Sequence, residues 1–217
     1  MLDWTAIDTV LLDMDGTLLD LHFDNFFWLE YLPLRYAEQH GLPLPVAKAR
    51  LEGFSAALQG SLNWYCLDHW SRELALDVEA IKREVSTGVK FRPGAEDFLR
   101  FLRASGKHCV LLTNAHPKAL EIKHVASGLG TYLHAMYSTH PFGLAKENEG
   151  FWPAFAYATG IDYHRCLFID DSLPVLRRAR EEGVARVLQV LQPDMSLPPR
   201  AASEFPGILH FSELLPA

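Results

Sequence analysis

The sequence lacks several features that mark specialised classes of protein. It has only three cysteines, Cys66, Cys109 and Cys166, and no Cys-x-x-Cys spacing, which disfavours a disulfide framework and a zinc site and predicts three free thiols. No stretch approaches eighteen uninterrupted apolar residues, the length that would predict a membrane-spanning helix. The first ten residues carry acids where a secretory signal carries Lys or Arg, so we expect a cytoplasmic protein with no membrane partner.

Basic residues are also scarce. The chain has 20 Lys and Arg against 27 Asp and Glu, a formal net charge of −7, and no basic run that could neutralise the phosphates of a polynucleotide. We therefore expect no nucleic-acid partner, although a single small phosphorylated ligand remains compatible with the charge. The 217 residues suffice for one hydrophobic core with a smaller inserted unit, and no feature of the sequence specifies an oligomeric state.

Short apolar runs recur along the chain, and helix-like segments punctuated by Pro and Gly separate the later ones. Pro117 and Gly128, for example, bracket one such segment. Strands alternating with helices predict an α/β fold, a doubly wound parallel sheet with helices on both faces. The predicted strands are Thr9–Leu12, His108–Leu112, Ala135–Ser138, Arg165–Ile169 and Ala185–Val190.

The interval after the first strand breaks this alternation. It has no convincing strand but carries apolar residues at helical spacing, such as Leu67, Trp70 and Leu74. We predict a catalytic core formed by residues 1–20 and 89–217, and a helical cap formed by residues 21–88. The Pro- and Ser-rich stretch Gln192–Pro206 predicts a surface loop.

The first predicted strand ends in VLLDMDGTLLD, with two carboxylates two positions apart. A strand followed by an Asp-Gly turn explains much of this pattern without any chemistry. It does not explain the doubling, because residues i and i+2 of an extended chain point the same way. Asp13 and Asp15 would repel each other if both were ionised there, so the pair requires a cation or a shared proton.

Further polar residues follow the other predicted strands. In an open parallel sheet the carboxyl ends of the strands face one ligand-binding edge. If all are ionised, the four carboxylates and the one lysine at this edge leave an excess of about three negative charges. Such an excess predicts a bound hard dication such as Mg²⁺. A lysine and a hydroxyl at this edge would hold phosphoryl oxygens. The residues expected to converge are Asp13, Asp15, Thr113, Asn114, Lys146, Asp170 and Asp171.

The set Asp13-x-Asp15-Gly-Thr17, Thr113, Lys146 and Asp170-Asp171 resembles the four motifs of the haloacid dehalogenase superfamily of phosphatases. The resemblance implies that Asp13 is the nucleophile and that Asp15 is the general acid and base, with a backbone carbonyl that binds Mg²⁺. It further implies that Thr17 helps to orient this acid. Asp171 would then be a direct metal ligand, with Asp170 supporting the metal shell.

The resemblance also implies which reaction and which substrates to expect. Dehalogenases of the superfamily lack the second aspartate, so Asp15 favours phosphoryl chemistry. The segments LDMDGTLLDLHFDN, LNWYCLDHW, LLTNAHP and LFIDDS are similar to bacterial GMP/IMP 5′-nucleotidases, which implies hydrolysis of purine nucleoside 5′-monophosphates. A phosphosugar or phosphoglycolate phosphatase, or a phosphomutase, is the alternative within the superfamily. A noncatalytic regulator that binds a phosphorylated metabolite is a third possibility.

Residues of the predicted cap and its hinge allow two interpretations. The aromatic side chains of Trp64, Tyr65 and Trp70 could stack on a purine, or form the core of the cap. His22 and Asp24 could contact substrate at the hinge, or be solvated. His116 follows the predicted phosphate loop at a helix start, where an anion could bind or where the ring could simply pack.

Overall fold

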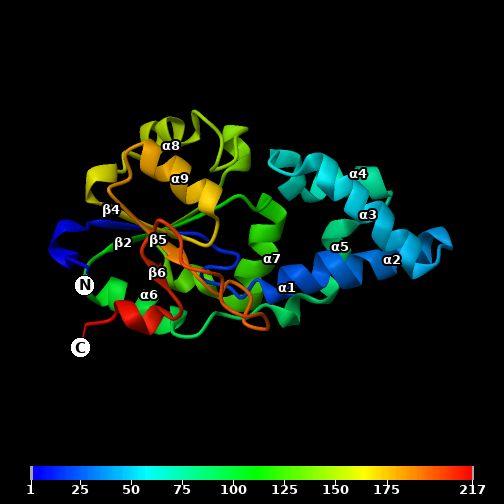
Figure 1. The fold of residues 1–217 in the computed structure, drawn as a ribbon, viewed down its shortest axis with the longest axis horizontal. Coiled ribbons are helices and arrows are strands. Elements are labelled where there is room, and N and C mark those ends of the chain that lie inside the picture. The colour runs from blue at the N-terminus through cyan, green and yellow to red at the C-terminus, as the bar shows by residue number, and fades with distance from the viewer. Residues whose placement is uncertain (1, 217) are drawn as a thin grey trace.

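A six-stranded parallel sheet forms the centre of the structure, a computed structural model that describes residues 2–216 (Figure 1). The strand order is β3-β2-β1-β4-β5-β6. All five predicted strands are present, with ends that differ from the prediction by at most one residue. A sixth strand, β6, has only two residues and was not predicted. The strands are β1 (Thr9–Leu12), β2 (His108–Thr113), β3 (Ala135–Ser138), β4 (Cys166–Asp170), β5 (Arg186–Val190) and β6 (Gly207–Ile208).

Helices cover both faces of this sheet, as the alternating pattern predicts. Along β1, Val10 and Leu12 join one hydrophobic cluster and Leu11 joins the other, because successive side chains of a strand point to opposite faces. The first cluster contains residues of α6 (Ala95–Ala104) and α7 (Pro117–Ser127). The second contains residues of α8 (Phe151–Thr159) and α9 (Leu173–Glu181). The fold is therefore a doubly wound α/β core.

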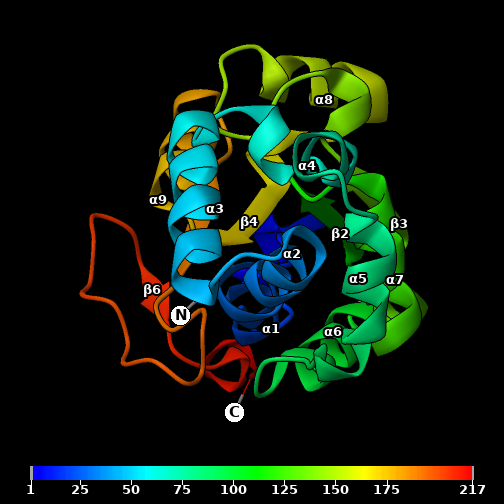
Figure 2. The same ribbon diagram turned by 90° about the vertical axis from the view of Figure 1, so that its right-hand side faces the viewer.

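A helical insert follows β1 and lies beyond one edge of the sheet, where Figure 2 shows it in front of the strands. No strand occurs between His22 and Glu84, all of which the structure describes. None of the helices within residues 2–216 combines the length and apolar character that crossing a membrane requires. The insert contains α1 (His22–Phe26), a π-helix (Phe27–Tyr31), α2 (Leu32–His40), α3 (Leu44–Leu58), α4 (Leu67–Leu74) and α5 (Val78–Glu84).

The insert has its own aromatic and aliphatic interior. Leu67, Trp70 and Leu74 line the buried side of α4, as their spacing predicts. The indole ring of Trp70 lies 5.4 Å from that of Trp28 and only 3% of Trp70 is exposed. Trp70 is thus part of the interior of the insert, and the packing interpretation holds for it. The carboxylate of Asp77 accepts a hydrogen bond from Ala80 N–H and caps α5.

The chain enters and leaves the insert along two adjacent segments. The backbone N–H of Asp20 donates to the carbonyl of Lys90, and the N–H of Arg92 donates to the carbonyl of Leu18. The buried Arg92 guanidinium also donates to the carbonyl oxygens of Gln192 and Leu209, which ties the chain after β5 to this crossing. Both connections are therefore anchored to the core beside the end of β1.

Short 3-10 helices and loops complete the chain. The predicted loop after β5 has neither helix nor strand from Gln192 to Pro206, but it is not wholly at the surface, since Asp194 is buried. Asp194 accepts a hydrogen bond from the Asn25 side chain, which packs the loop against the insert. The 3-10 helices are Trp4–Ala6, Leu62–Tyr65, Ser86–Gly88, Leu129–Tyr132, His140–Phe142, Tyr163–Arg165 and Phe211–Leu214.

Candidate active site

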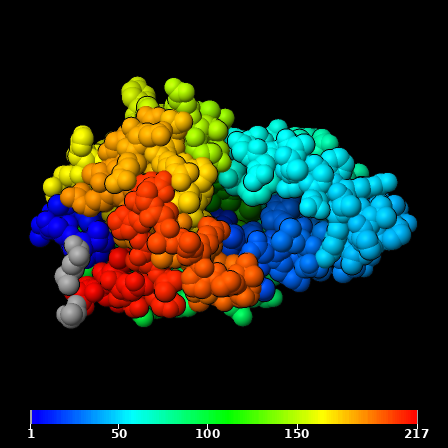
Figure 3. Space-filling model, viewed as in Figure 1, coloured from blue at the N-terminus to red at the C-terminus, as the bar shows by residue number. Residues whose placement is uncertain are grey.

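The ends of three neighbouring strands bring the predicted polar residues together. Asp13 follows β1, and its N–H donates to the carbonyl of Ile169 at 3.0 Å, which continues the pairing with β4. Thr113 is the last residue of β2 and Asp170 the last of β4. Figure 3 shows that the molecular surface is recessed between the core and the insert. The insert therefore faces the edge of the sheet at which these residues meet.

Lys146 is the centre of this cluster. Its Nζ donates to Asp13 Oδ1 at 2.5 Å, to Asp170 Oδ2 at 2.7 Å and to the carbonyl of Leu112 at 3.1 Å. Burial alone would lower the pKa of Lys146, but the two carboxylates outweigh it and raise the pKa above its usual range. A buried ammonium is thus held charged next to Asp13.

Three carboxylates lie close enough to hold one cation. One oxygen from each of Asp13, Asp170 and Asp171 lies within 4.8 Å of the others. Burial raises the pKa of Asp13 to about 6 despite Lys146. Burial also raises the pKa values of Asp170 and Asp171, and a neighbouring aspartate adds to each shift. A set of oxygen donors that resist ionisation in one another's presence fits Mg²⁺, whose charge would favour the carboxylate forms.

The loop between Asp13 and Thr17 depends on glycine at position 16. Gly16 has a φ of +85°, and a Cβ built there would lie 2.9 Å from Pro193 Cβ and 3.0 Å from the carboxyl carbon of Asp171. Both the backbone conformation and this close approach exclude a larger residue. Gly16 therefore lets the Asp13–Thr17 loop lie directly against Asp171.

Asp15 belongs to a second charged network that links the core to the insert. The Nζ of Lys123, on α7, lies 2.5 Å from Asp15 Oδ1 and 2.6 Å from Asp24 Oδ2. The other oxygen of Asp24 accepts from Lys82 Nζ, on α5, at 2.8 Å. Both lysines are only 1% exposed. Lys82 Nζ also lies 4.2 Å from the centroid of the Phe27 ring, a cation–π contact.

This network shifts the pKa values of its two carboxylates in opposite directions. Burial raises the pKa of Asp15, and the negative charge of Asp24 adds to the shift while Lys123 opposes it. Burial would also raise the pKa of Asp24, but Lys123 and Lys82 together hold it below its usual range. Asp24 is therefore a half-buried carboxylate between two ammonium groups, not a solvated hinge residue.

The other predicted residues differ in how they join the cluster. The hydroxyl oxygen of Thr113 accepts from Ala115 N–H at 3.0 Å. Asn114 accepts from Lys146 N–H at 2.9 Å and donates to Glu147 Oε2 at 2.8 Å. Thr17 is fully buried, yet its hydroxyl has no hydrogen-bond partner within residues 2–216, so the structure shows no hydrogen bond to Asp15. Its orienting role stays a prediction.

Sequence reasoning missed three cations of the site region. Lys82 and Lys123 resemble surface residues of amphipathic helices, and Arg200 lies in the Pro- and Ser-rich loop. The Nη1 of Arg200 donates to Asp171 Oδ2 at 3.1 Å and to the carbonyl of Asp171 at 2.9 Å. Lys123 and Arg200 reduce the excess negative charge below that counted from the motifs alone.

Three residues of the insert that could contact substrate have other partners in the structure. Tyr65 reaches across to the core, where its hydroxyl donates to Glu147 Oε1 at 3.1 Å. The Trp64 indole N–H donates to Ser55 within the insert. His22 is mostly exposed and lies 3.6 Å from Asp194. Tyr65 is thus the predicted aromatic residue that links the insert to the residues around Lys146.

Comparison with known proteins identifies related sequences. The family of haloacid dehalogenase-like hydrolases matches residues 7–183. The GMP/IMP nucleotidase YrfG of Escherichia coli (strain K12) is 41% identical over 214 residues, which cover 99% of this chain and 96% of that protein. The family match spans both the strand-end residues and the helical insert.

Solved structures share the fold at low sequence identity. A HAD phosphatase from Thermococcus onnurineus superimposes with a TM-score of 0.78 at 18% identity, over 96% of each chain. A predicted phosphoglycolate phosphatase from Haemophilus somnus gives a TM-score of 0.65 at 15% identity, also over 96% of each chain. These likenesses establish the architecture of the core and its helical insert.

Proposed function

The chain belongs to the haloacid dehalogenase-like hydrolases, and on that premise we propose that it is a magnesium-dependent phosphatase acting on purine nucleoside 5′-monophosphates. The observation that carries phosphatase chemistry is the pair Asp13 and Asp15, a buried and a half-buried carboxylate that contact different lysines. The extent of the similarity to a GMP/IMP nucleotidase supports GMP and IMP as substrates.

In the proposed reaction Asp13 attacks phosphorus through a carboxylate oxygen. The bond between phosphorus and the ester oxygen breaks, and Asp15 donates its proton to that oxygen, which releases the nucleoside. Asp15 then takes a proton from a water molecule that attacks the aspartyl phosphate. Phosphate leaves and the Asp13 carboxylate is restored. The raised pKa of Asp15 suits it to begin this cycle in the protonated form.

The remaining residues of the cluster position the phosphoryl group. Asp13, Asp170 and Asp171, with the backbone carbonyl of Asp15, would hold Mg²⁺, which supplies positive charge next to the phosphate. We assign Lys146 to the phosphoryl oxygens and to the ionisation of Asp13, which it contacts directly. The hydroxyl oxygen of Thr113 accepts a hydrogen bond from Ala115 N–H. The hydroxyl group can therefore donate its own proton to a phosphoryl oxygen.

We further propose that residues 21–88 act as a cap that closes over the substrate and opens to release product. Ion pairs between α7 of the core and the insert support a closed arrangement. Lys118 Nζ lies 2.7 Å from Asp68 and 3.1 Å from Glu79. Exposed pairs of this kind contribute only about 0 to 1 kcal/mol each, so they can break and re-form during turnover.

A substrate panel tests the proposed function. With purified protein and Mg²⁺ we expect phosphate release from GMP and IMP with kcat/KM at least about tenfold above that for AMP, pyrimidine monophosphates, phosphoglycolate and sugar phosphates. Chelation of the metal should abolish release, and restored Mg²⁺ should recover it. A preference for a sugar phosphate or phosphoglycolate would contradict the substrate assignment. An isomeric ester would indicate a mutase, and no turnover of any ester would indicate a binding protein.

The Lys123 network predicts opposite pH shifts for two substitutions. Lys123→Met removes the charge that lowers the pKa of Asp15, so the alkaline limb of kcat/KM should move up by about one pH unit. Asp24→Asn removes a charge that raises this pKa, so the limb should move down. Lys90→Met, which removes an exposed lysine outside this network, is the control. Shifts in one common direction would contradict the electrostatic coupling of Asp24 and Lys123 to the acid.

A further inference from the structure

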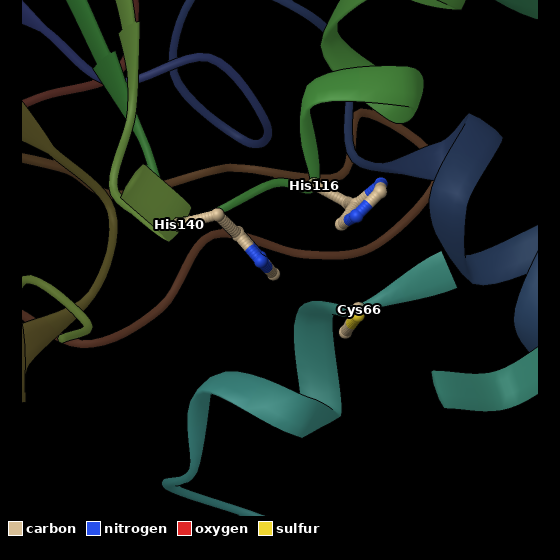
Figure 4. Close-up of side chains that lie close together, drawn as sticks. All are labelled: Cys66, His116 and His140. Atoms are coloured by element: carbon tan, nitrogen blue, oxygen red, sulfur yellow. The ribbon is translucent and has the colours of Figure 1, made fainter. Parts of the chain in front are cut away.

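Cys66, His116 and His140 lie together at the junction of insert and core (Figure 4), as a group separate from Asp13, Asp170 and Asp171. Cys66 precedes α4 of the insert, His116 precedes α7, and His140 begins a 3-10 helix after β3. Each offers one possible ligand atom, and these atoms all lie within 4.8 Å of one another. Three segments far apart in the sequence thus bring one sulfur and two imidazoles to a single place.

His140 has a nitrogen that the protein leaves without a partner. Its Nε2 is buried and makes no hydrogen bond within residues 2–216. In Figure 4 the ring points from the core toward Cys66. In the tautomer protonated at Nδ1, the lone pair of the His140 ring is on Nε2, the buried nitrogen that has no partner among the described residues.

The two other side chains are suited to complete a set of ligands. Cys66 is a free thiol and half-buried, and its sulfur accepts from His69 N–H at 3.4 Å. The ring of His116 lies 4.9 Å from that of His140 at an interplanar angle of 87°. Its Nε2 is 3.7 Å from Asp68 Oδ2, and its Nδ1 accepts weakly from Lys118 N–H at 3.4 Å. A metal ion bound at Nδ1 would replace the weak contact with Lys118 N–H and would leave Nε2–H to donate to Asp68, a second partner that suits a coordinating imidazole.

We propose that Cys66, His116 and His140 form a second metal site, for a borderline-soft divalent cation such as Zn²⁺. One thiolate and two imidazoles suit Zn²⁺, which binds three protein ligands and leaves a fourth position for water. They do not suit Mg²⁺, which requires oxygen ligands. The absence of Cys-x-x-Cys spacing argues against a zinc site from sequence, but this set is assembled from three separated segments.

The site would connect the insert to the core. Cys66 belongs to the insert, whereas His116 and His140 belong to the core. A bound ion would therefore hold the insert in the arrangement seen here and slow its opening, without occupying the carboxylates around Lys146. This inhibitory consequence rests on the proposed function; binding of the metal does not.

Co²⁺ provides a probe that reports the sulfur ligand directly. Titration of the purified full-length protein should produce a thiolate-to-cobalt charge-transfer absorption that saturates at one equivalent and that Zn²⁺ displaces. The carboxylate cluster contains no sulfur and cannot produce this band. Cys66→Ser should eliminate it, while the serine hydroxyl can still accept from His69 N–H and preserve the start of α4. No band in the wild-type protein, or a band that persists in Cys66→Ser, would overturn the proposal.

Substitution of the histidines tests the rest of the set. His140→Gln and His116→Gln should each weaken Co²⁺ binding by at least about tenfold. His164→Gln, which removes an exposed imidazole elsewhere in the core, should bind as the wild type does. Unchanged binding in either test variant would remove that histidine from the site. Zn²⁺ added to the Mg²⁺-loaded enzyme should inhibit the wild type at concentrations at least about tenfold lower than Cys66→Ser. Equal inhibition of both would contradict the proposed restraint of the insert.

Discussion

In the Asp13→Asn variant we expect phosphate release from every substrate to fall by a factor on the order of 10⁴ or more. An amide oxygen is a far weaker nucleophile than a carboxylate, and no other carboxylate is placed to replace it. Asp170 accepts from Lys146 Nζ and from Ser172 N–H, so both of its oxygens are engaged. The measurement is single-turnover release of phosphate, together with acid-quenched mass spectrometry for a phosphorylated Asp13 peptide in the wild type.

The fold should tolerate this substitution. Burial raises the pKa of Asp13 to about 6, so ionisation of this carboxyl is less favourable in the folded chain than in the unfolded chain. The protonated Asp13 carboxyl stabilises the folded chain, and this stabilisation is lost as the pH rises through about 6. The asparagine side chain does not ionise and so avoids that loss. We expect a melting temperature within about 5 °C of the wild type in the presence of a chelator. Asp8→Asn, at an exposed aspartate paired with Arg165, is the matched control and should retain full activity.

Near-normal magnesium-dependent turnover by Asp13→Asn would exclude Asp13 as the nucleophile. Phosphorylation of a different residue in the wild type would do the same. Because asparagine next to a catalytic centre can deamidate, the variant must be checked by intact mass before residual activity is interpreted.

The positions of the core residues could be predicted because they follow strands. Parallel strands align their carboxyl ends, so apolar runs followed by polar residues are enough to place Asp13, Thr113 and Asp170 at one edge. The same reasoning could not find β6, because two residues after a Pro- and Ser-rich loop carry no periodicity. Its pairing with β5 depends on where the loop returns the chain.

Sequence patterns could not predict the charged contacts between insert and core. Lys123 and Lys82 lie on helices whose other residues are partly polar, and periodicity alone assigns such lysines to solvent. They are buried because the insert packs over α7, an arrangement set by tertiary structure. For Trp70 the sequence left two interpretations open, stacking on a base or packing inside the insert, and packing with Trp28 decides for the second.

Asp15→Asn should separate the two half-reactions. For GMP and IMP the leaving group is an alkoxide that needs a proton, so we expect kcat to fall by about 10² to 10⁴. With p-nitrophenyl phosphate the leaving phenolate needs no proton, so the first step should remain fast. The second step should be slow for both, because no carboxylate is left to activate water. The expected record is a burst of about one equivalent of nitrophenolate followed by slow release, and no burst of nucleoside.

The burst distinguishes loss of proton transfer from a general disturbance of the site. Asp13→Asn should show no burst with either substrate, and Asp8→Asn should show wild-type kinetics. If Asp15→Asn slowed the first step equally for p-nitrophenyl phosphate and for GMP, the side chain would act by positioning and not as an acid.

Asp15 approaches Lys123 and no other ammonium in the described network, and that lysine also contacts Asp24 of the insert. Asp15, which we propose as the acid for the leaving group, is therefore connected to the insert through one side chain, that of Lys123.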